Sequence, residues 1–213
     1  MVSLFYVNAS NAHRTKPIPV CEWYNVTMKQ WWLKTVHAWM KRIDGRWASL
    51  SSLVFLGFVL WALPAASSAA NTLGLTQSID TSLGMSADRL WAIAELYGPS
   101  LRQAYIIQRW TFDVIWPWVY GSFFWISGVY LVKYLRLSDV WKTLLVIIPL
   151  GVGFDFLENS LVSLVFALYP TRWAGLTELA VAMIPIKWFF VGASMVLVMG
   201  LGLWAIVHKV IKK

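Results

Sequence analysis

The chain has 213 residues, of which 59% are hydrophobic and only 13% are charged; an average soluble domain is roughly 45–50% apolar and about 25% charged, so this composition is that of an integral membrane protein. The formal net charge is +8, but the basic residues gather beside apolar runs, which indicates anionic lipid and membrane topology and gives no reason to expect nucleic acid. Cys21 is the only cysteine and the three histidines lie outside the apolar runs, so we expect no internal disulfide, no haem or zinc site and no other cofactor.

The first part of the chain, residues 1–45, is polar and basic, and we interpret it as a cytoplasmic segment. Its residues 1–27 are expected to be disordered. A helix is predicted over 28–42 because apolar residues share one side of it while lysines and arginines occupy most of the rest: Trp32, Val36, Trp39 and Ile43. Such a helix suits an anionic membrane surface. A basic flank that only fixes the orientation of the chain is an equal alternative.

The remainder, residues 46–213, is predicted to be a four-span membrane domain. Each apolar run has at least the roughly 20 residues that a helix needs to cross the hydrocarbon core, and the approximate spans are 47–66, 109–132, 141–168 and 176–207. Lysines and arginines gather before the first span, between the second and third, and in the tail. This distribution predicts that both termini are cytoplasmic.

The long connection after the first span is predicted to lie outside the membrane. Residues Asn71 to Gly84 are rich in Ser, Thr and Gly and have the composition of a loop. Ser86 to Tyr97 then predicts a short amphipathic helix, with Ser86 as its N-cap. Gly98-Pro99 ends this helix. The expected fold class is therefore all-α: a polytopic four-helix bundle with an external amphipathic helix.

Ionisable residues interrupt the spans at depths where a charge is costly, which marks them as candidates for function. Asp155, Glu158 and Asn159 are spaced i, i+3, i+4 within Gly153-Phe-Asp-Phe-Leu-Glu-Asn159 and therefore share one face of the third span. Further polar residues lie at compatible depths on the neighbouring spans: Arg109, Asp113, Tyr120 and Lys187. We expect these groups to form one network inside the bundle.

Three functions fit this network. In the first, the protein is an enzyme or binding protein for a lipid or another hydrophobic small molecule; the carboxyls that can act as acid or base are those of Asp155, Glu158 and Asp113, and the groups that can bind a ligand are those of Asn159, Lys187, Tyr120 and Arg109. In the second, the protein takes part in proton- or ion-coupled transport. The cytoplasmic halves of the spans argue against this function, because they contain no ionisable residue that could continue a path across the membrane. In the third, the network is structural: Lys187 pairs with Asp155 or Glu158, and Arg109 pairs with Asp113. Membrane lipids are expected partners, and oligomerisation is open.

Four short segments also carry a family likeness: Leu96-Tyr-Gly-Pro-Ser-Leu-Arg-Gln-Ala-Tyr105, Phe112-Asp-Val-Ile-Trp-Pro-Trp-Val-Tyr-Gly121, Phe154-Asp-Phe-Leu-Glu-Asn159 and Ile186-Lys-Trp188. Together they resemble the signatures of an uncharacterised family of small bacterial four-span membrane proteins. Leu101 stands where the family pattern has glycine. The resemblance implies a place in the bacterial inner membrane. It also implies that Tyr97, Arg102 and Tyr105 join the intramembrane residues in one site that opens toward the outer face.

Overall fold

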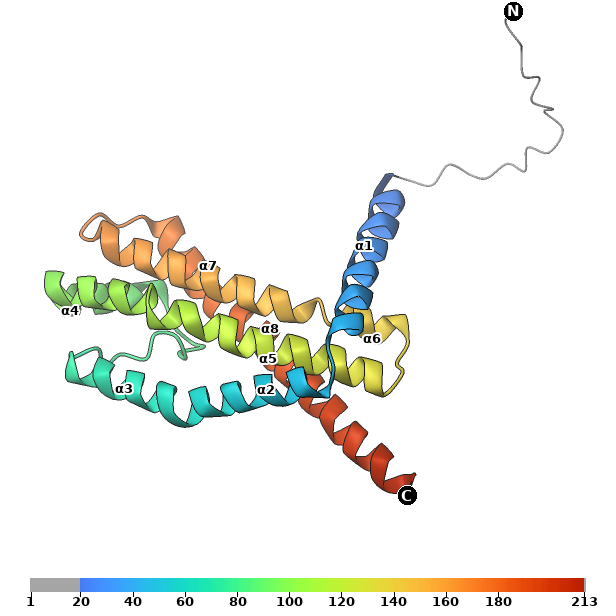
Figure 1. The fold of residues 1–213 in the computed structure, drawn as a ribbon. Helices are drawn as coiled ribbons and strands as arrows, with labels where there is room; N and C mark the ends of the chain where they lie inside the picture. Colours follow the sequence, from blue (N-terminus) through green and yellow to red (C-terminus); the bar gives the residue numbers. More distant parts are fainter. Residues whose placement is uncertain (1–19, 213) are drawn as a thin grey trace, which may run out of the picture.

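The computed structural model describes residues 20–212 and is built of helices, with no strand in that range (Figure 1). The elements follow one another as α1 (Val20–Arg42), α2 (Gly45–Gly57), η1 (Phe58–Ala62), α3 (Leu63–Thr72), α4 (Ala87–Arg109), α5 (Phe112–Tyr134), α6 (Asp139–Leu144), α7 (Ile147–Leu168) and α8 (Ala174–Ile211). Four helical stretches are long and apolar enough to cross a membrane: Gly45–Thr72, Ala87–Tyr134, Asp139–Leu168 and Gly175–Ile211. The predicted all-α, four-span bundle is confirmed.

The bundle has two chemically different ends. At the loop end, the connection 73–86 and α4 pack on α7 and α8, and buried Leu75 and Ile79 of the connection belong to this core. At the α6 end, the core is mostly apolar and comes mainly from α5, with further residues from α1, α7 and α8. α7 and α8 run along each other for most of their lengths, and α5 packs on both. The polar residues of the spans therefore face one another in the loop half of the bundle.

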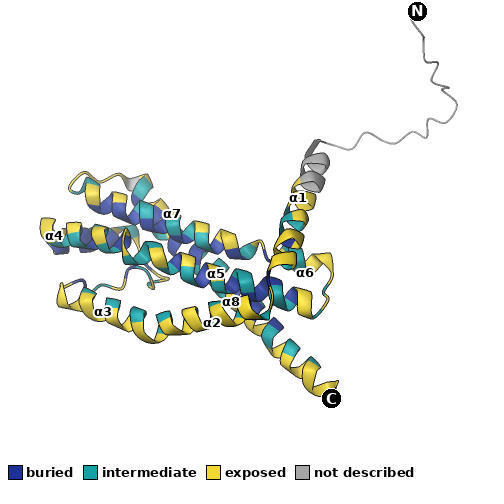
Figure 2. Cartoon of the chain, viewed as in Figure 1, coloured by how far each residue is buried: buried dark blue, intermediate teal, exposed yellow. Residues whose placement is uncertain are grey.

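The first span is peripheral to this core. No residue of α2, η1 or α3 is fully buried, and Figure 2 shows their surfaces largely exposed. The span contacts α5 through stacked aromatic rings, with Phe55 4.3 Å from Phe123 and Phe58 5.4 Å from Trp116 between ring centroids. Its outward face carries exposed Leu60 and Trp61, as suits a helix surrounded by lipid.

The expected amphipathic helix forms the first part of α4. The hydroxyl of Ser86 accepts a hydrogen bond from the amide of Arg89 at 3.2 Å, and the apolar face of the helix is buried at Leu90, Ile93 and Tyr97. Gly98 breaks the helix with a φ of +60°, a conformation that favours glycine. The rest of α4 then runs from Pro99 toward α5.

The N-terminal helix differs from its prediction. α1 begins at Val20, so residues 20–27 are helical and not disordered; residues 1–19 lie outside the described part of the chain. The side that was expected to meet lipid packs on the bundle, with Val36 and Ile43 buried in the core of the α6 end. The indole of Trp32 donates a hydrogen bond to the carbonyl of Lys142 at 2.9 Å. The apolar side of α1 therefore packs on α5 and α6 and does not lie on the membrane surface.

Close approach of α7 and α8 depends on a glycine. A Cβ at Gly151 would lie 3.3 Å from the backbone nitrogen of Val191, whereas a Cβ at Gly153, on the same helix, would meet no atom within 4 Å. We expect Gly151→Leu to destabilise the protein by about 1–3 kcal/mol, since overpacking forces the helices apart, and Gly153→Leu to have little effect. Thermal unfolding in detergent measures both; equal melting temperatures would contradict this account of the interface.

Candidate functional site

A cluster of polar side chains fills the loop half of the bundle. We call it the polar cluster; its members come from the connection 73–86 and from α4, α5, α7 and α8, and are Asp80, Tyr105, Arg109, Asp113, Tyr120, Asp155, Glu158, Asn159 and Lys187. The i, i+3, i+4 spacing on α7 places Asp155, Glu158 and Asn159 on one face, as predicted. Eight of the ten residues proposed from the sequence thus lie together, and Asp80 joins them.

Arg109, the last residue of α4, is the hub of the polar cluster. Its Nε and Nη2 donate to the hydroxyl of Tyr105 at 2.8 and 2.6 Å. Its Nη1 donates to Oδ1 of Asn159 at 2.8 Å and to Oδ1 of Asp80 at 3.4 Å. The same Nη1 lies 3.1 Å from Oδ2 of Asp113, the expected partner one turn away. All three nitrogen atoms of this buried guanidinium are therefore engaged.

Lys187 of α8 supplies the second positive charge. Its Nζ donates to Oε2 of Glu158 at 3.1 Å and forms a close ion pair with Asp80. Of the two pairings that the sequence left open for Lys187, the structure has the one with Glu158. Glu158 is fully buried, and its Oε1 lies 3.6 Å from Nη2 of Arg109 but accepts no hydrogen bond. The carboxylate therefore sits between two cations with one oxygen short of a donor.

Asp155 is held by neutral groups. The hydroxyl of Tyr120 donates to Oδ2 of Asp155 at 2.9 Å, and Nδ2 of Asn159 approaches Oδ1 at 3.4 Å. The same Nδ2 donates to the carbonyl of Asp113 at 3.2 Å. Asn159 thus joins α7 to the start of α5, while Asp155 has no ion pair within the described residues. Asp155 is the carboxyl of the cluster that is farthest from charge compensation.

Asp80 was not predicted from the sequence, which gave residues 71–84 only as a loop. Ile79 is buried beside it, and the carbonyl of Asp80 accepts a hydrogen bond from the indole of Trp188 at 2.7 Å. Burial raises the pKa of the Asp80 carboxyl, but the attraction of Arg109 and then of Lys187 outweighs burial and lowers that pKa from 3.8 to about 2. Asp80 is therefore ionised at neutral pH. Its ion pairs with Arg109 and Lys187 hold the connection 73–86 against the polar cluster.

Two residues that the resemblance assigns to the site lie apart from the polar cluster. The hydroxyl of Tyr97 accepts a hydrogen bond from the amide of Gln77 at 3.1 Å. Arg102 donates to the carbonyl of Ala94 at 2.8 Å, across the break at Gly98, and its guanidinium stacks 4.2 Å from the ring centre of Tyr169. Tyr97 holds the connection and Arg102 holds the bend of α4. Tyr105 alone of this group touches the charged residues.

Two cavities meet at the polar cluster. The inner cavity has a volume of about 20 Å³ and is lined by side chains of the second, third and fourth spans, including Tyr120, Asp155 and Lys187; this is room for about one water molecule. The outer pocket has a volume of about 240 Å³ and lies among α3, the connection 73–86 and the α4–α5 junction. Asp80, Arg109 and Asp113 line both. The inner cavity thus lies among the second, third and fourth spans, whereas the outer pocket adjoins the first span.

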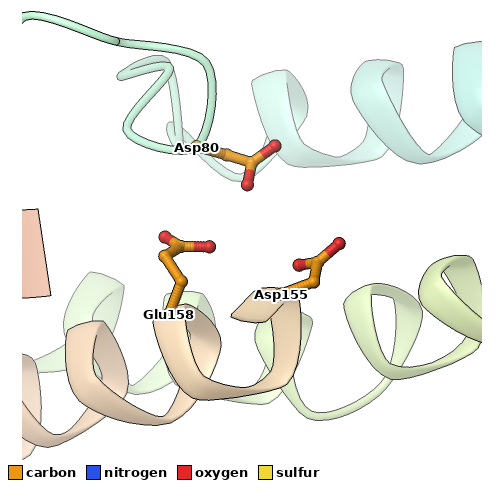
Figure 3. A group of neighbouring side chains, drawn as sticks. All are labelled: Asp80, Asp155 and Glu158. Atoms are coloured by element: carbon orange, nitrogen blue, oxygen red, sulfur yellow. The ribbon is translucent and has the colours of Figure 1, made fainter. Parts of the chain in front are cut away.

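The three carboxylates in Figure 3 also have the spacing of a cation site. Oxygen atoms of Asp80, Asp155 and Glu158 lie within 4.8 Å of one another, and their carboxyl groups point toward one another. The ammonium group of Lys187, however, already contacts Asp80 and Glu158. A metal ion at this position would have to displace it. The donor set therefore fits a lysine better than a resident metal ion.

Comparison with known protein families, with curated proteins and with solved structures finds no match to this chain. The resemblance to a family of four-span proteins therefore stays a prediction. The features of this chain that indicate a function are the polar cluster and the two cavities.

Proposed function

We propose that this protein binds an amphiphilic small molecule, such as a lipid, in the outer pocket, with the polar end of the ligand against the polar cluster. One observation carries the proposal: the outer pocket joins apolar residues of α3, including Leu63 and Ala66, to the charged side chains of Asp80 and Asp113. A pocket with an apolar wall and a few convergent polar groups is the usual form of a small-molecule site.

The proposal includes an orientation. Basic residues of α1, of the α5–α6 connection and of the C-terminal end of α8 belong to elements at the α6 end of the bundle (Figure 1). Because an excess of lysine and arginine is typical of the cytoplasmic side, the proposed orientation has this end and both termini in the cytoplasm. The outer pocket then opens on the outer face of the membrane, the bacterial inner membrane if the resemblance holds. The core of the α6 end is apolar, so no chain of ionisable groups continues across the described bundle. A site that opens to one side fits this arrangement better than a transport path.

Any acid or base chemistry in the outer pocket falls to the carboxylates that line it. Of the three catalytic candidates from the sequence, Asp113 lines both cavities, Asp155 lines only the inner one and Glu158 lines neither. Asp113 and Asp80 are therefore the groups that would touch a ligand. Asp155 and Glu158 act through the network as positioning residues.

A purely structural role is the second candidate, because the polar cluster ties four elements and the connection together and nearly all its buried atoms are bonded. A substitution that fills the outer pocket with a larger side chain distinguishes the binding function from the structural one. Ala66 of α3 lines the pocket, whereas its neighbour Ala65 is exposed and does not. Both belong to a span that contributes no buried residue, so phenylalanine at either position should leave folding intact.

We expect wild type and Ala65→Phe, purified in mild detergent, to retain the same specific lipid or small molecule, detected by mass spectrometry. Ala66→Phe should retain at least about tenfold less, a loss of about 1.4 kcal/mol in binding. Melting temperatures of the three proteins serve as the control for folding. Identical bound molecules in all three, at equal stability, would contradict the binding function and favour the structural one.

A further inference from the structure

The outer pocket presents negative charge and free hydrogen-bond acceptors. The side chains of Asp80 and Asp113 are 40% and 22% exposed, and both line the pocket. Within the described residues, neither Oδ2 of Asp80 nor Oδ1 of Asp113 accepts a hydrogen bond or forms an ion pair. Two carboxylate oxygens are therefore available to a ligand that can donate.

The basic side chain in the lining of the outer pocket has no free hydrogen-bond donor for an anion. Arg109 is the basic residue that lines the outer pocket, and its donors are directed at Tyr105, Asn159 and Asp80. The remaining polar residues of the lining are neutral, among them Gln108. A carboxylate or phosphate group in the pocket would face two aspartates without a free guanidinium to receive it.

The polar cluster as a whole also lacks donors and positive charge. Its four carboxyl groups face two cations, Arg109 and Lys187. The shortage is visible at Glu158, whose buried Oε1 accepts no hydrogen bond although the carboxyl points toward Asp80 (Figure 3). Unbalanced charge is costly away from water. A positively charged group beside Asp80 and Asp113 would reduce this imbalance.

The lining of the outer pocket also includes apolar side chains. Leu63, Ala66 and Ala70 of α3 and Phe112 of α5 are its apolar members, beside Ser67 and Asn71 of α3. From these observations we infer that the ligand of the outer pocket is a cationic amphiphile, with a primary ammonium group on Asp80 and Asp113 and an alkyl chain along α3. The inference rests on the proposed function and names its ligand class. Hydrogen bonds from an ammonium to a carboxylate are among the strongest in proteins.

Binding of four probes to the detergent-solubilised full chain at pH 7 tests the inference. Dodecylamine, dodecanol and dodecanoate share a chain length and differ in head charge, while butylamine keeps the head without the chain. We expect dodecylamine to bind at least about tenfold more tightly than each of the others, measured by titration of tryptophan fluorescence and by thermal shift. Butylamine that binds as well as dodecylamine would assign the site to a small soluble amine and overturn the amphiphile.

Three variants locate the binding. Ala66→Phe should lose dodecylamine affinity by at least about tenfold, Asp113→Asn should lose a similar factor, and Ala65→Phe should keep wild-type affinity. Dodecanol or dodecanoate that binds at least as tightly as dodecylamine, and is lost in Ala66→Phe, would overturn the cationic ligand but leave the proposed function standing. Dodecylamine that binds Ala66→Phe and wild type equally would show that it enters the micelle and not the pocket, and would overturn the inference. Because α3 is peripheral, Ala66→Phe decides the matter even if Asp113→Asn fails to fold.

Discussion

Replacing Lys187 by methionine is expected to destabilise the protein by about 3–5 kcal/mol, the loss found when one partner of a buried ion pair is removed. Lys187 is almost completely buried and contacts both Asp80 and Glu158. Methionine keeps most of the volume of the side chain, so the effect reports the lost charge. The free energy of unfolding is measured by equilibrium unfolding in mixed micelles of SDS and dodecyl maltoside.

A second substitution distinguishes this explanation from a general packing defect. Glu158→Gln removes one of the two negative partners of Lys187, and in the double variant of Lys187→Met with Glu158→Gln neither side chain of this pair carries a charge. The loss in the double variant should be smaller than the sum of the single losses by about 0.5–3 kcal/mol, the range found for contacting residues. Strictly additive losses would show that the pair does not interact. Lys209→Met, at the exposed C-terminal end of α8, is the matched control and should remain at wild-type stability.

The spans and the polar face of α7 could be predicted because each follows from a local pattern. A run of about 20 apolar residues is long enough to cross a membrane wherever it occurs, and an i, i+3, i+4 spacing fixes a shared helix face before any tertiary contact is known. Ser86 and Gly98 could be assigned for the same reason, since an N-cap and a left-handed glycine are properties of short segments.

Asp80 could not be placed in this way. It is separated by 107 residues from Lys187 and lies in a connection without periodicity, so nothing local indicates that it turns inward. The available signal was weak: Asp80 is the only ionisable residue between Thr72 and Ser86, and it follows an isoleucine in a segment of small polar residues. Insertion of a carboxylate from a connection among membrane spans is a tertiary contact, and in the sequence only the balance of charges could have suggested it.

The location of the outer pocket was also beyond the sequence. An apolar residue on a span suits lipid and protein neighbours equally, because lipid tails are as apolar as leucine. The sequence of α3 therefore does not indicate that Ala66 lines a pocket while Ala65 faces outward. The same ambiguity affected α1, whose apolar side was assigned to the membrane surface and instead packs on α5 and α6.

Arg109 gives the second large effect, because it is the residue that joins the most members of the polar cluster. Arg109→Met is expected to destabilise the protein by about 3–5 kcal/mol, since it leaves Asp113 and Oε1 of Glu158 without a cation. Arg89→Met is the control: this arginine lies in the same helix, is exposed, and makes no side-chain hydrogen bond or ion pair in the described structure. Unfolding in mixed micelles again measures the difference.

Arg109→Lys then separates charge from geometry. Lysine keeps the positive charge but cannot reproduce the planar fork, with which Arg109 donates through Nε and Nη2 to Tyr105 and through Nη1 to Asn159. We expect this variant to lose about 1–3 kcal/mol, the range for unsatisfied buried hydrogen-bonding groups, and so to lie between wild type and Arg109→Met. Equal stability of Arg109→Lys and wild type would mean that the cluster needs only a charge at this position. Equal losses in Arg109→Lys and Arg109→Met would mean that the hydrogen-bonding geometry, more than the charge, holds the connection, α4 and α7 together.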